Sequence, residues 1–109
     1  GEGYTKNSPM LPGQGDDEFK ALIQKDLLPA FERFKPEVIL VSVGFDALDA
    51  DEMADMRLSR ECFTWIAEQL RALADQYAGG RMVSVLEGGY SLDHLGVLAE
   101  DHLKVLMKD

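Results

Sequence analysis

Two short apolar runs, separated by 37 residues, constrain the fold of this chain more than any other feature. Residues 37–43 read EVILVSV and residues 81–86 read RMVSVL. Both are almost continuously apolar and rich in β-branched residues, which is typical of strands buried on both faces of a parallel sheet. Because the segment between them is long enough for a helix, a right-handed crossover would pair them in parallel. The pattern therefore predicts an α/β fold with parallel strands and flanking helices.

An amphipathic helix is predicted before the first strand. Asp16 and Asp17 are suited to the first turn of a helix, where unpaired N–H groups leave partial positive charge. From Phe19 to Phe34, apolar residues recur at steps of three and four. Pro29 lies within this stripe, and because proline lacks a backbone N–H it predicts a kink or two abutting helices there.

The remaining segments follow from capping residues and composition. Ser59 is suited to the N-cap of a helix, and residues 79–80, both glycine, should end that helix. A last amphipathic helix is predicted over about residues 91–107. Residues 1–15, rich in glycine and proline, predict an extended entry segment, and residues 44–57 predict an acidic loop.

The predicted sheet is small for a chain of this kind. The 109 residues are enough for one hydrophobic core, but two strands are fewer than the roughly five or six of a doubly wound sheet. Either the strands pair across two chains, or the rest of the sheet lies elsewhere in the protein, and we favour the second alternative. The absence of an initiator Met and of a targeting pattern at Gly1 agrees with it. We therefore expect residues 1–109 to be one piece of a larger domain.

Charge and cysteine content exclude several classes of function. Twenty acidic and eleven basic residues give a net charge of −9, which argues against direct binding of nucleic acid or of an anionic membrane, since both require clustered Lys and Arg. The longest apolar stretch, residues 38–43, is far shorter than the roughly 20 residues of a membrane span. The single cysteine, Cys62, excludes an internal disulfide and fits a reducing, cytoplasmic location.

Two residues that follow the predicted strands are candidates for chemistry. Asp46 follows the first strand and Tyr90 follows the second. In open parallel sheets, ligands bind beyond the carboxyl ends of the strands, so both would lie on the same rim. A carboxylate there could hold a metal ion, and a tyrosine could donate a hydrogen bond to a developing oxyanion. The structural alternative is an aspartate that caps a loop and a tyrosine that packs on the sheet edge.

Other residues favour structural roles. The acidic loop lacks the glycine of a calcium-binding EF-hand loop, so a solvated loop is the simpler interpretation. His94 and His102 are eight residues apart, too far for a metal-binding pair on adjacent helical turns. Cys62 has no neighbouring base in the sequence and is predicted to be a buried, inert thiol.

Several motifs resemble those of zinc-dependent deacetylases. The most specific are residues 41–47 (VSVGFDA) and residues 85–92 (VLEGGYSL), and residues 9–15 (PMLPGQG) and 28–31 (LPAF) also follow the pattern. This superfamily comprises histone deacetylases, acetylpolyamine amidohydrolases and acetoin-utilisation proteins. The residues of these motifs are most similar to those of class II and bacterial members. The resemblance implies the C-terminal part of an arginase–deacetylase fold, since it covers the last third or so of the catalytic domain.

The resemblance implies roles for the two candidate residues. Asp46 occupies the position of the third zinc ligand, and Tyr90 that of the tyrosine that polarises the substrate carbonyl. Gly88 and Gly89 match the glycines beside the acetyl-binding channel. Met53 ends a stretch of the loop that lines the substrate entrance in relatives.

A second metal site and a substrate class are implied in the same way. Tyr4 lies where the family contributes a backbone carbonyl to a structural K⁺ or Na⁺ ion. The zinc-dependent parent would remove an acetyl group from acetyl-lysine or from an acetylated amine or polyamine.

The chain also departs from the family pattern. The D-x-H segment that supplies the other two zinc ligands and the tandem histidines that serve as general base are not in the sequence. We therefore expect the 109-residue chain alone to be inactive. The alternatives are a non-catalytic α/β binding module that self-associates through its sheet and, less favoured, an enzyme assembled across a dimer.

Overall fold

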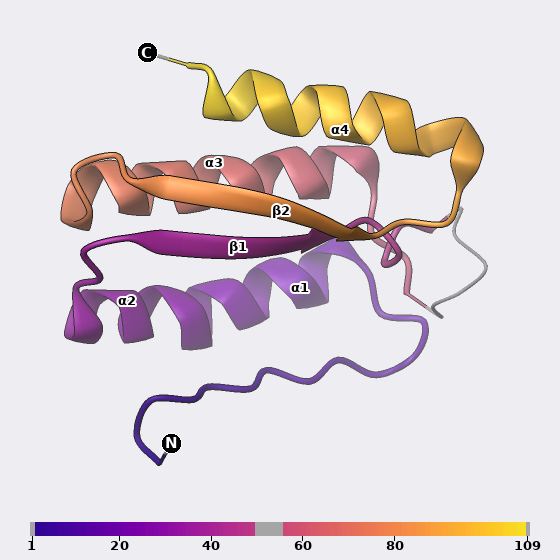
Figure 1. The fold of residues 1–109 in the computed structure, drawn as a ribbon. Coiled ribbons are helices and arrows are strands. Elements are labelled where there is room, and N and C mark those ends of the chain that lie inside the picture. The colour runs from indigo at the N-terminus through magenta and orange to yellow at the C-terminus, as the bar shows by residue number, and fades with distance from the viewer. Residues whose placement is uncertain (1, 50–55, 109) are drawn as a thin grey trace.

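A computed structural model describes residues 2–49 and 56–108 and contains both predicted strands and all predicted helices. Figure 1 shows the two strands side by side, with helices running alongside them. In chain order the elements are α1 (Asp16–Leu22), the π-helical segment η1 (Ile23–Leu27), α2 (Leu28–Phe34), β1 (Ile39–Gly44), α3 (Arg60–Tyr77), β2 (Met82–Gly88) and α4 (Leu92–Leu106).

Strands β1 and β2 are parallel neighbours, as predicted. Their register pairs Ile39 with Met82 and continues in step to Val43 and Leu86. The next pair is Gly44 with Gly88, so β2 contains one extra residue, Glu87, at this end. The irregularity is a β-bulge, and it brings the last residues of the two strands opposite one another.

One face of the sheet carries the core. Ile39 packs with Leu73 and Ala74 of α3, and residues of α2 join this cluster. Farther along, Val43 packs with a second cluster that includes Leu98 of α4. Alternate residues of β1 therefore face the helices.

The other face of the sheet has no cover within the described residues. Leu40 is 75% exposed, Val83 53% and Val85 56%. The burial on both faces that the apolar runs predict would need the rest of the sheet, which we expect to lie elsewhere in the protein. An apolar run indicates that both faces of a strand need to be buried. The helices or strands that bury them can lie far away in the sequence.

The interruption predicted at Pro29 takes the form of a wider helical turn. Segment η1 joins α1 to α2, and Pro29 lies in the first turn of α2. Proline cannot donate the hydrogen bond of a continuous α-helix and its ring crowds the preceding turn. A π-helical turn absorbs this mismatch without breaking the helix.

The predicted helix ends are close to those observed. Ser59 is the N-cap of α3, and its hydroxyl accepts a hydrogen bond from the Cys62 N–H at 3.2 Å. After α3, Gly79 and Gly80 adopt φ values of 60° and 79°, which side-chain-bearing residues rarely adopt. Among the described residues, none of the helices has both the length and the apolar character to cross a membrane.

Candidate active site

Asp46 and Tyr90 lie at the same edge of the sheet. The Gly44–Gly88 pair closes the ladder, and each candidate residue comes two positions after its glycine. The Phe45 N–H donates a hydrogen bond to the Gly88 carbonyl at 3.0 Å, so the two chain segments stay joined just beyond the strands. The placement predicted from parallel strands is confirmed.

Phe45 anchors the segment that carries Asp46. Its side chain is 3% exposed and packs edge-on against Phe63 of α3, with ring centroids 5.3 Å apart. The His102 ring of α4 lies on another side, at 6.3 Å. Because Phe45 is fixed by both helices, the adjacent aspartate leaves the core at a defined position.

The Asp46 carboxylate lies against two glycines. A β-carbon built at Gly44 would be 2.8 Å from Asp46 Oδ1, and one built at Gly88 would be 3.1 Å from the same atom. Gly89 is constrained differently: its φ is +136°, and a β-carbon there would be 3.0 Å from Leu95 Cδ1. All three glycines thus have a packing reason to lack a side chain.

The two ends of the loop that follows Asp46 are joined. The Asp49 N–H donates to the Leu58 carbonyl at 2.9 Å, and the Leu58 N–H donates to the Ala47 carbonyl at 3.0 Å. Leu48 and Leu58 are both buried. Met53, predicted to line the substrate entrance, lies outside the described residues.

Asp16 links the start of α1 to the start of α3, a role that its place in the sequence did not predict. Its carboxylate accepts the Ser59 backbone N–H at 2.8 Å and also the Ser59 hydroxyl. Burial would raise the pKa of Asp16, but the hydrogen bonds from Ser59 outweigh it and the pKa is lowered. Burial, followed by the nearby Asp16 charge, raises the pKa of the Cys62 thiol to about 12. Cys62 is fully buried, as predicted.

The Asp16 contact predicts an acid-sensitive contribution to stability. A carboxyl whose pKa is lowered on folding stabilises the protein above its unfolded pKa, near 3.8 here, and loses that contribution as pH falls through the folded pKa. Asp16→Asn should lower the free energy of unfolding at pH 7 by about 1.5 kcal/mol, the low end for a hydrogen bond to a charged group. Urea unfolding at pH 7 and at a pH below the folded pKa of Asp16, which is lower than 3.8, measures this.

Asp17 provides the matched control for that measurement, since it lies in the same helical turn and is exposed. Asp17→Asn should change stability little at either pH. An Asp16→Asn deficit that persisted unchanged below the folded pKa would contradict the ionic origin of the effect.

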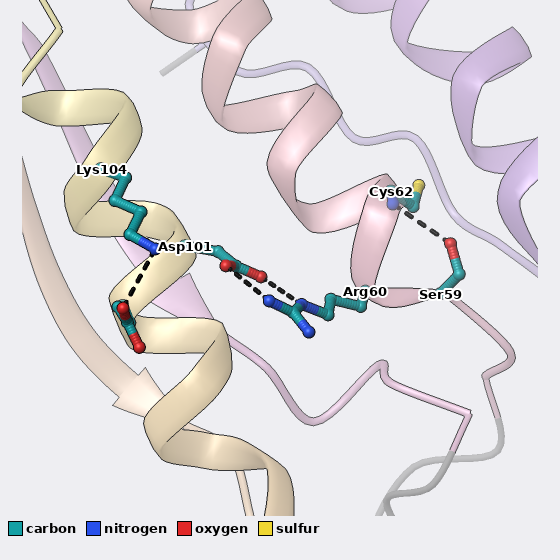
Figure 2. A network of polar contacts seen from close by, with 6 residues as sticks. Ser59, Arg60, Cys62, Asp101 and Lys104 are labelled. Carbon is teal, nitrogen blue, oxygen red and sulfur yellow. Dashed lines mark hydrogen bonds and ion pairs between the residues drawn. The ribbon is translucent and has the colours of Figure 1, made fainter.

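Helix α4, which follows Tyr90, is held to α3 by polar contacts. Figure 2 shows the Arg60 guanidinium of α3 directed at the Asp101 carboxylate of α4, and the two nitrogen–oxygen distances are 2.5 and 2.9 Å. At the other end, Arg71 donates to the Leu106 carbonyl at 2.7 Å. These links, with the apolar contacts of Leu98, fix the helix that begins beside the candidate site.

The candidate metal ligand that the structure places at this rim is the Asp46 carboxylate. No group of three or more His, Cys, Asp or Glu side chains suited to a metal ion occurs in residues 2–49 and 56–108. Catalytic zinc normally has three protein ligands. Asp46 fits such a site because its carboxylate is an oxygen ligand held in a recess that a β-carbon would fill. Zinc would need two further ligands from beyond this set.

The two histidines have structural surroundings, as predicted. His102 Nε2 lies 3.0 Å from the Ser84 hydroxyl oxygen of β2, and burial lowers the pKa of His102. His94 Nδ1 lies 2.8 Å from the Ser91 hydroxyl oxygen in the first turn of α4. Tyr4 is largely exposed, with its ring edge-on to Phe34.

Comparison with known proteins identifies the family. The histone deacetylase domain family matches residues 1–106. The chain is 45% identical over 91 residues to a histone deacetylase-like amidohydrolase from Pseudomonas aeruginosa, covering 84% of this chain and 24% of that protein. It is 41% identical over 96 residues to the human polyamine deacetylase HDAC10, covering 87% and 14%.

A solved structure supports the same relationship. Acetylpolyamine aminohydrolase from Burkholderia pseudomallei superposes with a TM-score of 0.82 at 26% identity, over 95% of this chain and 29% of that one. The chain thus spans about a quarter of the length of the amidohydrolase from P. aeruginosa. The α/β arrangement is that of part of a deacetylase domain, and the chain belongs to the histone deacetylase domain family.

Proposed function

We propose that this chain forms the part of a zinc-dependent deacetylase that contributes the zinc ligand Asp46 and the oxyanion donor Tyr90. One observation carries the proposal: both residues follow the paired glycines that end β1 and β2, so they share one edge of the sheet. Membership of the histone deacetylase domain family supports the proposal, because members of this family are typically enzymes, namely deacetylases or amidohydrolases.

The residues of this chain would have different roles, which follow from the chemistry of their side chains. A bound zinc ion would supply Lewis acidity and a more acidic attacking water. Asp46 would hold that ion through its carboxylate. Tyr90 would donate its hydroxyl hydrogen to the substrate carbonyl oxygen, where negative charge grows in the transition state. Gly88 and Gly89 would lie beside the channel that binds the acetyl group, and Met53 would line the entrance to that channel.

The substrate class rests on the relatives. We propose acetylated lysine or an acetylated amine or polyamine, since one relative is a polyamine deacetylase and another an acetylpolyamine aminohydrolase. The backbone carbonyl of Tyr4 would bind K⁺ or Na⁺. A cytoplasmic location and the lack of a nucleic-acid or membrane partner belong to the same proposal.

We also propose, as the sequence predicts, that residues 1–109 are one piece of a larger catalytic domain. The histidine base and the two other zinc ligands are not in these 109 residues. The histidine base, the zinc ligands and Tyr90 stabilise the same transition state. A chain that has only some of these groups therefore does not keep a proportionate part of the activity. The isolated chain should therefore show no zinc-dependent hydrolysis.

Zinc binding by the full-length protein tests the proposal. Asp46→Asn should weaken zinc affinity by more than the roughly 10–100-fold that loss of an outer-shell contact costs, because a direct ligand is removed. Dialysis against zinc buffers followed by metal analysis measures this. Asp49→Asn, an exposed aspartate three positions later, is the control and should keep the wild-type zinc content. Full zinc affinity in Asp46→Asn would refute the proposal.

The bare face of the sheet favours a second candidate function, self-association of the isolated chain. Leu40, Val83 and Val85 form an exposed apolar surface on paired strands, and such surfaces drive association. Sedimentation of the isolated chain should show oligomers that Val83→Lys disperses and that Leu92→Lys, at an exposed residue of α4, leaves intact. A clean monomer at high concentration, without hydrophobic-dye binding, would exclude this function.

A further inference from the structure

Gly88 occupies a position where the backbone does not require glycine. Among the glycines that the structure describes, those with positive φ are Gly3, Gly13, Gly79, Gly80 and Gly89, and neither Gly88 nor its partner Gly44 is one of them. A side chain at residue 88 would therefore meet no conformational penalty of the kind that glycine relieves. The reason for glycine at this position must be space.

The side chain nearest to a β-carbon at residue 88 would be that of Asp46. The three nearest atoms to a β-carbon built there all belong to Asp46: Oδ1 at 3.1 Å, Cγ at 3.3 Å and Oδ2 at 3.7 Å. On the opposite strand, a β-carbon at Gly44 would be 2.8 Å from Asp46 Oδ1. The carboxylate thus lies against both glycines of the last pair in the ladder.

The β-bulge at Glu87 creates this arrangement. In an uninterrupted register, Glu87 would face Gly44, and its side-chain-bearing α-carbon would lie at the last pair. The extra residue moves Gly88 into that position instead. The bulge and the glycine together open the recess in which the carboxylate lies.

We propose that Gly88 is a positioning residue for Asp46: the missing side chain lets the carboxylate lie against β2 at the place from which it reaches the metal. This inference rests on the proposed function, in which Asp46 binds zinc. It differs from the role that the resemblance implies, a glycine that borders the acetyl group.

The distances indicate how much a methyl group would matter. Contacts of 3.0–3.4 Å require the neighbour to move by a few tenths of an ångström. Metal–ligand distances tolerate only about 0.2 Å. Alanine at residue 88 would therefore displace the carboxylate beyond the tolerance of a zinc ligand, although the helices and strands stay in place.

Zinc affinity of the full-length protein is the first test. Gly88→Ala should bind zinc about 10–100-fold more weakly, as outer-shell changes typically do, in competition with a chromophoric chelator. Gly96→Ala is the matched control, since Gly96 is an exposed residue of α4 with nothing within 4 Å of a built β-carbon. Equal zinc affinities in the two variants, with a raised KM in Gly88→Ala alone, would overturn the inference in favour of a channel role.

Thermal unfolding of the metal-free protein is the second test and does not depend on activity. Gly88→Ala should lower Tm, and this loss should shrink when Asp46→Ala is also present, because the crowded carboxylate is gone. Undiminished loss in the double variant would overturn the inference.

The two tests separate this inference from the proposed function. Full zinc affinity in Asp46→Asn would refute Asp46 as a ligand, and with it the proposed function. Zinc lost in Asp46→Asn but retained in Gly88→Ala would overturn only the positioning role of Gly88.

Discussion

Tyr90→Phe in the full-length protein is expected to lower the turnover of an acetylated substrate by about 10²–10³-fold, or roughly 2.7–4 kcal/mol of transition-state stabilisation. The variant removes one hydroxyl at the carboxyl end of β2 and leaves Asp46 in place. Zinc content should therefore equal that of the wild type. Turnover and metal analysis on the same preparation measure both expectations.

A second tyrosine provides the control. Tyr77 packs in the core cluster around Ile39, at the opposite end of β1 from Asp46. Tyr77→Phe removes the same atom and should leave turnover close to wild type. Wild-type turnover in Tyr90→Phe would show that the Tyr90 hydroxyl has no part in stabilising the oxyanion, even if the zinc site is as proposed.

Phe45→Ala is expected to have the largest effect on stability, about 3–5 kcal/mol, the usual cost of emptying a buried phenylalanine site. The ring is 3% exposed and lies between α3 and α4. Because Asp46 is the next residue, we also expect weaker zinc binding in the fraction that remains folded. Urea unfolding of the full-length protein, followed by zinc titration, measures the two effects.

Phe45→Leu is the matched variant for this prediction. It retains most of the buried apolar surface and should cost only a minor part of the stability lost in Phe45→Ala. An unfolding midpoint for Phe45→Ala that matched the wild type would show that Phe45 does not anchor the loop.

Local patterns carried most of the secondary structure. The apolar runs at residues 38–43 and 81–86 predicted β1 and β2 to within two residues, and the predicted last helix at 91–107 contains α4. These signals are local because capping, proline geometry and helical periodicity act over a few neighbouring residues. The shared rim of Asp46 and Tyr90 followed from the same signals, since a crossover helix forces parallel strands.

Contacts between distant segments were not predictable in this way. Asp16 and Ser59 are 43 residues apart, and the local sequence predicted for Asp16 only a place in the first turn of a helix. The bulge at Glu87 depends on how two strands align, and no pattern within either strand reports it.

The sequence by itself determined that this chain forms parallel strands with flanking helices, and it placed Asp46 and Tyr90 at their carboxyl ends. Only the tertiary structure decided that the Asp46 carboxylate lies between Gly44 and Gly88, and that one sheet face carries Leu40 without cover. The physical reason is the range of the interactions: backbone propensity and hydrophobic periodicity act along the chain. Close packing, in contrast, acts between atoms that folding brings together, where a few tenths of an ångström decide which side chain fits.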